Sequence, residues 1–271
     1  MADTLVWLAA LPLIGAVATL LLPRQGNAIA NASAVATAVT AGILVHAVSG
    51  QGALHYAIGG WQAGLGIALR ADGLSALLLL MTALVMLAAT TYAGAYFSTA
   101  AQRRHFWPLW LLLWTSLNAL LLAGDLFNLY VTLELLGLSA VALACLGGKT
   151  AAIRAALRYL LVGLLGSMMF LAGVSLIYAG YGTLDMAMLS TAMAPGPVAW
   201  TALALMTAGL LLKSALFPLH FWLPPAHAIA PAPVSAVLSA LVVKAAFYLL
   251  LRLWLDVFAV VITPAAASLL G

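Results

Sequence analysis

The chain has 271 residues, of which 66% are hydrophobic and only 6% carry a formal charge. An ordinary soluble domain has roughly 25% charged residues, so this composition excludes a cytosolic globular protein and a disordered chain. The net charge of +4 comes without a dense basic patch, which excludes a nucleic-acid binder. Cys145 is the only cysteine, which excludes a disulfide framework and a cysteine metal site. An all-α polytopic membrane protein is the class that remains.

Apolar runs of the length needed to cross a bilayer follow one another along the chain. We predict eight membrane helices, at about 4–22, 28–48, 74–94, 107–123, 127–146, 155–179, 198–217 and 233–254. A bilayer span needs about 20 apolar residues. The runs are too long, and too rich in Leu and Ala, for outer-membrane strands, which are about ten residues long and alternate in polarity.

Two of the connections are predicted to be structured. Residues 55–70 contain two short strand-like runs around a glycine-rich turn, which predicts an external hairpin. Residues 183–193 are typical of a short interfacial helix that starts at Thr183 or Asp185.

Basic residues are distributed unequally between the connections. Those that follow odd-numbered spans or begin the next span are Arg24, Arg103, Arg104, Lys149, Arg154 and Arg158. Even-numbered connections hold Arg70, Asp125 and Asp185. Under the positive-inside rule the odd connections lie in the cytoplasm and the N-terminus lies outside the cell (inner) membrane. No basic residue precedes the first run, so we expect a retained span and not a cleaved signal peptide.

The tryptophans and one acidic residue have simpler interpretations. Most of the eight tryptophans fall near span ends, where an interfacial aromatic belt is expected. Asp125 stands at the start of the fifth span and is expected to cap that helix.

Three ionisable side chains fall inside predicted spans. Glu134 lies seven residues into the fifth span, Lys213 about fifteen residues into the seventh, and Lys244 near the middle of the eighth. Each costs about 2.5–3.5 kcal/mol at the bilayer centre. One interpretation is a structural ion pair between Glu134 and a lysine. The interpretation we favour is proton or cation transfer, because a buried lysine beside a carboxylate is able to load and release a proton near neutral pH.

A proline-rich stretch, LLKSALFPLHFWLPPAHAIAPAPVS, surrounds and follows Lys213. Prolines interrupt helical hydrogen bonding, so we predict a broken helix near Pro218. Broken backbone at membrane depth is tolerated where it lines a watery cavity or is buried in protein. His220 and His227 follow the break, and histidine changes charge between pH 5 and 8. We predict a proton relay at His220 and a second candidate at His227; the alternative is an interfacial side chain with its hydrogen bonds satisfied.

The stretch from about 107 to 254 resembles the antiporter-like membrane subunits of respiratory complex I, of membrane-bound hydrogenases and of Mrp-type cation/proton antiporters. The motifs are GDLFNLYVTLELLGLSA at 124–140, LLKSALFPLHFWLPPAHAIAPAPVSAVLSALVVKAAFYLLLRLW at 211–254, and the weaker GGW…GI…RADGLSALLLL at 59–80. The wording looks closest to the D-type branch of the Mrp antiporter subunits.

The resemblance implies roles for the charged residues. The family's span-five glutamate falls on Glu134, its broken-helix lysine on Lys213 and its next-span lysine on Lys244. Its histidine near the break falls on His220, and His227 matches a polar position of some branches. In that family these residues form a proton half-channel and a hydrophilic axis. The five residues are therefore the predicted proton-transfer site, and no metal or cofactor site is predicted.

The resemblance also implies a domain organisation. We expect N-terminal membrane helices and an external hairpin over residues 1–106, an antiporter-like five-helix repeat over 107–254, and an apolar tail that begins a further helix over 255–271. Family members usually have about fourteen spans in two inverted five-helix repeats, and this chain carries only the first.

The expected function is proton translocation within a multisubunit antiporter, respiratory or hydrogenase complex. The expected partners are other membrane subunits and the lipid bilayer, and the chain is expected to have no active site or cofactor of its own, so any redox chemistry belongs to its partners. The alternatives are a non-conducting structural subunit, or a fragment of a fourteen-helix subunit.

Overall fold

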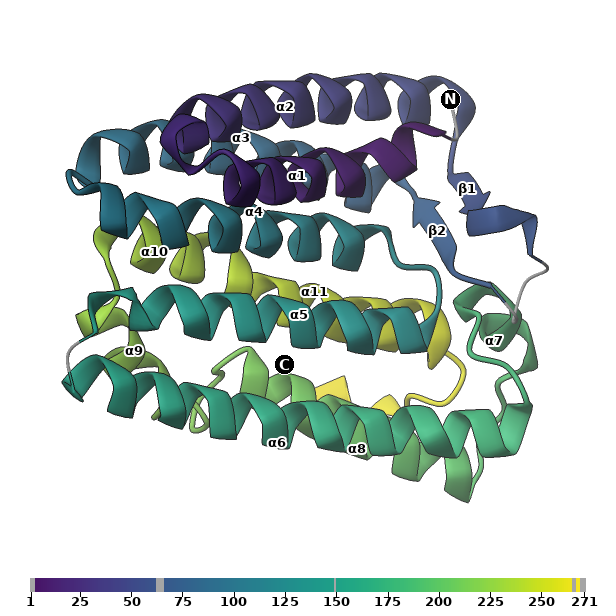
Figure 1. Cartoon of the computed structure of the whole chain (residues 1–271). Coiled ribbons are helices and arrows are strands. Elements are labelled where there is room, and N and C mark those ends of the chain that lie inside the picture. The colour runs from purple at the N-terminus through teal and green to yellow at the C-terminus, as the bar shows by residue number, and fades with distance from the viewer. Residues whose placement is uncertain (1–2, 62–65, 149, 265–266, 269–271) are drawn as a thin grey trace.

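The structure is a computed structural model that describes residues 3–61, 66–148, 150–264 and 267–268. Long helices lie side by side with their axes roughly parallel and form a bundle (Figure 1). The helices are α1 (Asp3–Leu21), α2 (Gly26–Gln51), α3 (Gly73–Tyr96), α4 (Ala100–Leu122), α5 (Leu126–Ala144), α6 (Thr150–Tyr181), α7 (Met186–Ala192), α8 (Pro197–Lys213), α9 (Leu223–Ile229), α10 (Ala232–Val237) and α11 (Val243–Arg252).

The predicted polytopic membrane fold is confirmed. Within the described ranges, seven helical runs are long and apolar enough to cross a membrane, and the 17-residue α8 stands where the remaining predicted span was placed. The fourth span begins earlier than expected, because the segment from Ala100 that contains two arginines already forms the first turns of α4.

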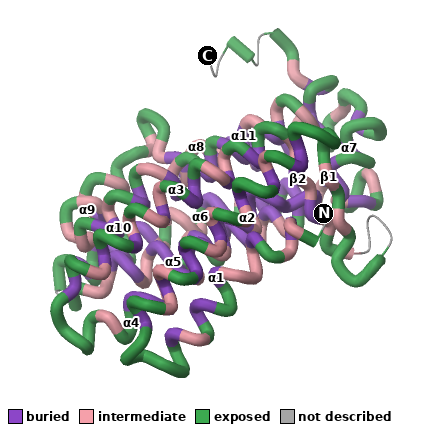
Figure 2. Tube along the Cα trace, turned by 90° about the horizontal axis from the view of Figure 1, so that it is seen from above, coloured by how far each residue is buried: buried purple, intermediate pink, exposed green. Residues whose placement is uncertain are grey.

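Helix α4 is the most buried of the spans, with 72% of its apolar window inside the bundle. Trp107, Trp110 and Trp114 on this helix are buried, so the prediction of an interfacial position is wrong for these three. The reason is that α4 packs against α1, α2, α3 and α5, so its ends are covered by protein. Trp110 donates an indole hydrogen bond to Thr90 on α3 at 2.9 Å. Figure 2 shows the buried residues running through the interior of the bundle.

The two ends of the bundle differ. One end, at the right of Figure 1, carries the antiparallel strands β1 (Leu54–Ala57) and β2 (Ala68–Ala71) together with α7; we call it the hairpin end. The hairpin prediction is confirmed, although residues 62–65 of its connection lie outside the described residues. Asp185 caps α7 by accepting hydrogen bonds from the amides of Ala187 and Met188, both at 2.9 Å.

The opposite end holds the connections α1–α2, α3–α4 and α5–α6, together with α9 (Figure 1). Described arginines in or next to these connections are Arg24, Arg103, Arg104, Arg154 and Arg158, and we call this the basic end. The basic side chains of the odd connections therefore gather at one end of the bundle. Which side of the membrane that end faces stays a prediction.

The predicted break after Lys213 is present. Helix α8 ends at Lys213, a turn region with a cis bond between Phe217 and Pro218 follows, and the chain resumes as the short α9. Helices α10 and α11 then form one run, joined and extended by two π-helical segments, Leu238–Val242 and Leu253–Val257. In the expected tail helix, residues 258–263 form turns and irregular chain, and residues 265–266 and 269–271 lie outside the described residues.

Candidate functional site

Two of the predicted charges meet inside the bundle. The Nζ atom of Lys213, the last residue of α8, lies 3.2 Å from Oε1 of Glu134 on α5. Only 9% of the lysine side chain and 18% of the glutamate side chain are exposed. A donor and acceptor that are both charged form a hydrogen bond roughly twice as strong as a neutral one, so each residue satisfies the other where water is scarce.

Glycines make room for the lysine side chain. A Cβ atom at Gly166 on α6 would lie 2.8 Å from the carbonyl oxygen of Gly209 on α8 and 3.0 Å from Cγ of Lys213. A Cβ atom at Gly137, three residues after Glu134, would lie 3.8 Å from Nζ of Lys213. The lysine stem therefore runs past Gly166 and carries the ammonium group to α5. Close helix approach through small residues is common in membrane bundles.

A cavity of about 30 Å³ adjoins the ion pair, and its lining is mostly apolar. Residues of α5, α6, α8, the turn region and the α10–α11 run line it: Leu133, Glu134, Leu136, Gly137, Leu138, Val141, Tyr159, Leu160, Gly163, Leu164, Lys213, Trp222, Val242 and Ala246. One water molecule needs roughly 10–15 Å³ measured in this way, so the cavity has room for a few waters. Charges in such surroundings interact more strongly than in bulk water.

The other three predicted residues do not contact this pair. His220 is exposed, and its ring stacks on Phe217 at a centroid distance of 5.9 Å. His227 shares a 2.8 Å hydrogen bond between its Nδ1 atom and the hydroxyl of Ser235 on α10. Lys244 is exposed on α11 and donates to the carbonyl oxygen of Ser239. The proton-transfer roles of these three residues stay predictions.

The π-helical segment before α11 gives Lys244 its acceptor. The amide of Val243 bonds to the carbonyl of Leu238, five residues earlier. A π-helical turn shifts the backbone hydrogen bonds by one residue, which leaves the carbonyl of Ser239 for the ammonium group. π-Helical turns are frequent at functional sites, and this one stands directly before Lys244.

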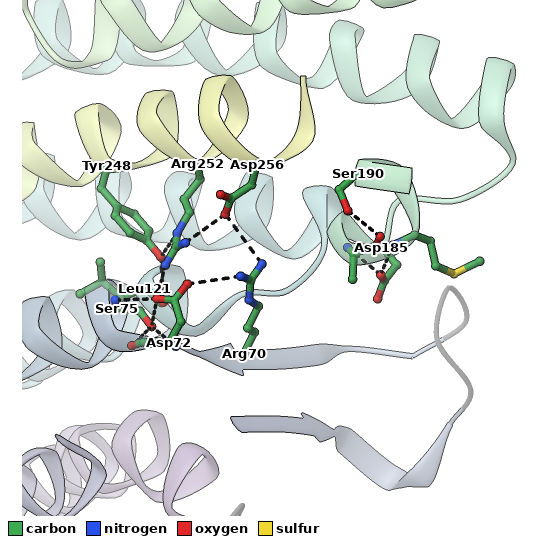
Figure 3. Close-up of polar contacts among 11 residues, drawn as sticks. Arg70, Asp72, Ser75, Leu121, Asp185, Ser190, Tyr248, Arg252 and Asp256 are labelled. Atoms are coloured by element: carbon green, nitrogen blue, oxygen red, sulfur yellow. Dashed lines mark hydrogen bonds and ion pairs between the residues drawn. The ribbon is translucent and has the colours of Figure 1, made fainter. Parts of the chain in front are cut away.

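A second charged cluster lies at the hairpin end and was missed from the sequence (Figure 3). Arg252 of α11 contacts Asp72 at the start of α3 and pairs with Asp256 at 3.0 Å. Arg70 of β2 pairs with Asp72 at 3.3 Å and with Asp256 at 3.7 Å. Tyr248 accepts a 2.9 Å hydrogen bond from Nε of Arg252. We call Arg70, Asp72, Tyr248, Arg252 and Asp256 the hairpin-end network.

The network changes the acidity of Asp72. Burial alone would raise the pKa of this carboxyl, but the hydrogen bond from Arg252, the amide of Ser75 and the charges of Arg252 and Arg70 outweigh it and hold the pKa well below its ordinary value. The i,i+4 spacing of Arg252 and Asp256 was the available sequence signal. Nothing in the sequence pointed to the contact between positions 72 and 252.

Asp125 and Asp185 lie close together at the same end. Asp125 caps α5, as predicted, by accepting a 2.7 Å hydrogen bond from the amide of Asn128, and it forms an isolated β-bridge with Asp185. Burial, and to a smaller extent the charge of Asp185, raises the pKa of Asp125. Across the part of the chain that the structure describes, no group of three or more His, Cys, Asp or Glu side chains is arranged to hold a metal ion.

Comparison with known proteins places this geometry in context. Residues 123–270, more than half of the chain, match the family model described as NADH:quinone oxidoreductase/Mrp antiporter, TM. The match covers α5 to α11, and so it includes Glu134, Lys213, Lys244 and both histidines of the turn region.

Two curated relatives have the same level of similarity. NADH-quinone oxidoreductase subunit N of Desulforudis audaxviator is 39% identical over 254 residues, covering 90% of this chain and 50% of the relative. The D-type subunit of a probable K(+)/H(+) antiporter of Rhizobium meliloti is 39% identical over 286 residues, covering 99% of this chain and 52% of the relative. The chain thus spans about half the length of these relatives.

Among solved structures, a chain of the membrane-bound sulfane sulfur reductase, an archaeal respiratory membrane complex, superimposes with a TM-score of 0.91 at 31% identity. The superposition covers 98% of this chain and 55% of that one. The similarity therefore includes the N-terminal helices and the hairpin as well as the part with the ion pair.

Proposed function

The chain belongs to the NADH:quinone oxidoreductase/Mrp antiporter family, and we propose that it translocates protons as one subunit of a multisubunit membrane complex. The observation that carries this proposal is the ion pair of Glu134 and Lys213 beside a cavity, at the point where α8 breaks. Ionisable groups inside a bilayer typically mark ion pathways and proton relays.

Lys213 is the proposed proton carrier. Its ammonium group is stabilised while Glu134 lies beside it, because the carboxylate compensates for the lost hydration. Separation of the two groups removes that compensation, and the lysine then gives its proton to the next acceptor. The distance between Nζ and Oε1 is thus the variable that loads and unloads the carrier.

The position of Lys213 at a helix end makes such a movement inexpensive. The backbone that follows it, residues 214–222, is a turn region and not a regular helix. A rearrangement there shifts the lysine without breaking a continuous hydrogen-bond ladder through α8. Broken helices line the binding sites of transporters for the same reason.

Protons leaving Lys213 need further groups, and we propose Lys244, His227 and His220 for that role. Lys244 stands directly after a π-helical segment of the α10–α11 run, and His227 contacts Ser235 on the same run. His220 lies in the turn region beside Phe217. The family resemblance implies these roles, and the bond distances within this chain leave them as separate steps.

The natural setting follows from the relatives. They are named as subunits of respiratory and antiporter complexes, and we propose that this chain also works among other membrane subunits, with its basic end facing the cytoplasm and its N-terminus outside. The positive-inside rule supports that orientation.

The test is transport in vesicles that contain the assembled complex. Lys213→Ala and Glu134→Gln should each abolish cation-dependent dissipation of a pH gradient, measured with Na⁺ and with K⁺. Lys213→Arg is a control for charge without a readily transferable proton, because arginine stays protonated, and it should also be inactive. Normal exchange by an assembled Lys213→Ala complex would rule out the carrier role.

The alternative is a structural subunit that conducts nothing, for which the Glu134–Lys213 bond would hold α5 to α8. In that case Lys213→Ala lowers the amount of assembled complex, and the surviving complexes transport at the normal rate. Transport is therefore divided by the amount of assembled subunit in every measurement.

A further inference from the structure

Tyr159 on α6 lines the same cavity as Glu134 and Lys213. Its side chain is buried, with 6% of the residue exposed. Among the described residues, no side chain or backbone group forms a hydrogen bond with its hydroxyl. A buried tyrosine usually finds a partner for its hydroxyl, and in this position the available partners are water in the cavity and the charged pair.

The ring of Tyr159 is held in place by Trp222. The two rings stack with a centroid distance of 4.6 Å and an interplanar angle of 15°. Trp222 is itself fixed, because its indole nitrogen donates a 3.0 Å hydrogen bond to the carbonyl oxygen of Leu212, the residue before Lys213. The aromatic pair is thus anchored to the end of α8 that carries the ion pair.

Tyr159 lies nearer to the basic end than the ion pair does. Helix α6 starts at that end with Thr150, and Gly166 marks the level at which the lysine stem passes. Seven residues separate Tyr159 from Gly166, which corresponds to about 10 Å along a helix. On α5 the cavity lining extends in the same direction, from Glu134 to Val141.

From this geometry we propose that Tyr159 is a further proton-transfer residue, whose hydroxyl links water on the side of the basic end to the Glu134–Lys213 pair. In one transfer the hydroxyl gives its proton to the acceptor on one side and accepts a proton from water on the other. The phenol is neutral before and after, so no charge stays on it. The proposal rests on the proposed function, since it names how protons reach that pair.

The deciding variant is Tyr159→Phe, which removes the hydroxyl and keeps the ring against Trp222. In vesicles with the complete complex, we expect its proton/cation exchange per assembled complex to fall at least tenfold, since positioned proton transfer contributes roughly 10²-fold or more. Tyr159→His should recover part of the rate, because imidazole stacks and also transfers protons. Tyr178→Phe on the exposed surface of the same helix is the matched control.

A second variant tests the water path without touching the tyrosine. Gly163 lines the cavity, and a Cβ atom there meets no other atom within 4 Å, so Gly163→Val should fold, narrow the cavity and lower the exchange rate. Exchange rates in H₂O and D₂O distinguish transfer from support, because a ring that only supports Trp222 leaves the solvent isotope effect unchanged.

The outcomes separate this proposal from the one before it. Wild-type exchange by Tyr159→Phe, together with an inactive Lys213→Ala, overturns the role of Tyr159 alone. Normal exchange by Lys213→Ala overturns the proposed function itself. A slow Tyr159→Phe variant that recovers in Tyr159→His supports the hydroxyl as the link, whereas equal losses in both variants overturn it.

Discussion

The Glu134–Lys213 pair and the hairpin-end network use the same kinds of group in different arrangements. In the pair, one cation contacts one carboxylate beside a cavity, and the lysine ends its helix. In the network, Arg252 contacts two carboxylates and a tyrosine, and Arg70 also reaches both carboxylates. A charge with one partner is free to change it, whereas a charge with three is held in one place.

The difference also concerns the groups themselves. Arginine stays protonated in proteins and its planar group matches carboxylates, while lysine carries a compact charge that is readily given up when buried. The lysine stands at mid-bundle next to space for water, and the arginines stand where the hairpin and the start of α3 meet the end of α11. The comparison predicts that the pair controls transport and the network controls stability.

The largest expected effect comes from removing both charges of the pair. The double variant Glu134→Gln/Lys213→Met should assemble as well as the wild type, because replacing a buried ion pair by neutral groups is often neutral for stability. Its exchange should equal that of vesicles without the complex. Measurable exchange at a normal rate would show that the pair is only structural.

Removing Arg252 should act on stability instead. Arg252→Met leaves Asp72 and Asp256 without their shared partner, and breaking a buried ion pair from one side costs about 3–5 kcal/mol. We expect a clearly lower thermal unfolding temperature in detergent, with exchange per assembled complex within twofold of the wild type. Arg104→Met, an exposed arginine at the basic end, is the control. A stable variant with lost exchange would contradict the comparison.

A methyl group at Gly166 should disturb the pair through packing. Gly166→Ala places a Cβ atom 2.8 Å from the carbonyl of Gly209 and 3.0 Å from Cγ of Lys213, so α6 and α8 must separate or the lysine must move. Overpacking of this kind costs about 1–3 kcal/mol. Reduced exchange and a lower unfolding temperature are expected together, and Gly163→Ala, which meets no atom within 4 Å, should change stability little.

The smallest effect is the acid sensitivity of the network. Because the folded state holds the pKa of Asp72 below its ordinary value, ionised Asp72 stabilises the fold above its unfolded pKa of about 4, and that stabilisation decreases as the pH falls further. Unfolding temperatures of the wild type and Asp72→Asn should therefore converge between about pH 5 and pH 3. A constant difference over this range would show that the contribution of Asp72 does not depend on its charge.

Much of the architecture could be predicted, because bilayer crossing imposes length and polarity rules on each segment separately. The spans, the hairpin at 55–70, the short helix capped by Asp185 and the break near Pro218 all follow from local patterns. Glu134 and Lys213 stood out because a charge inside an apolar run is costly wherever the helix packs.

The pattern could not show which helices are neighbours. The tryptophans of α4 were misplaced because nothing in an apolar run distinguishes lipid from protein around it. Tyr159 was not considered because tyrosine in a span is unremarkable until a cavity lies beside it.

The sequence by itself determined that this chain forms membrane helices, where they run, and which side chains are too costly to be there without a function. Only the tertiary structure decided that Lys213 bonds Glu134, that Lys244 does not, and that Arg252 reaches Asp72 across 180 positions of chain. The physical reason is that the cost of burying a charge belongs to one residue and its medium, whereas the compensation for that cost depends on which helix packs beside it.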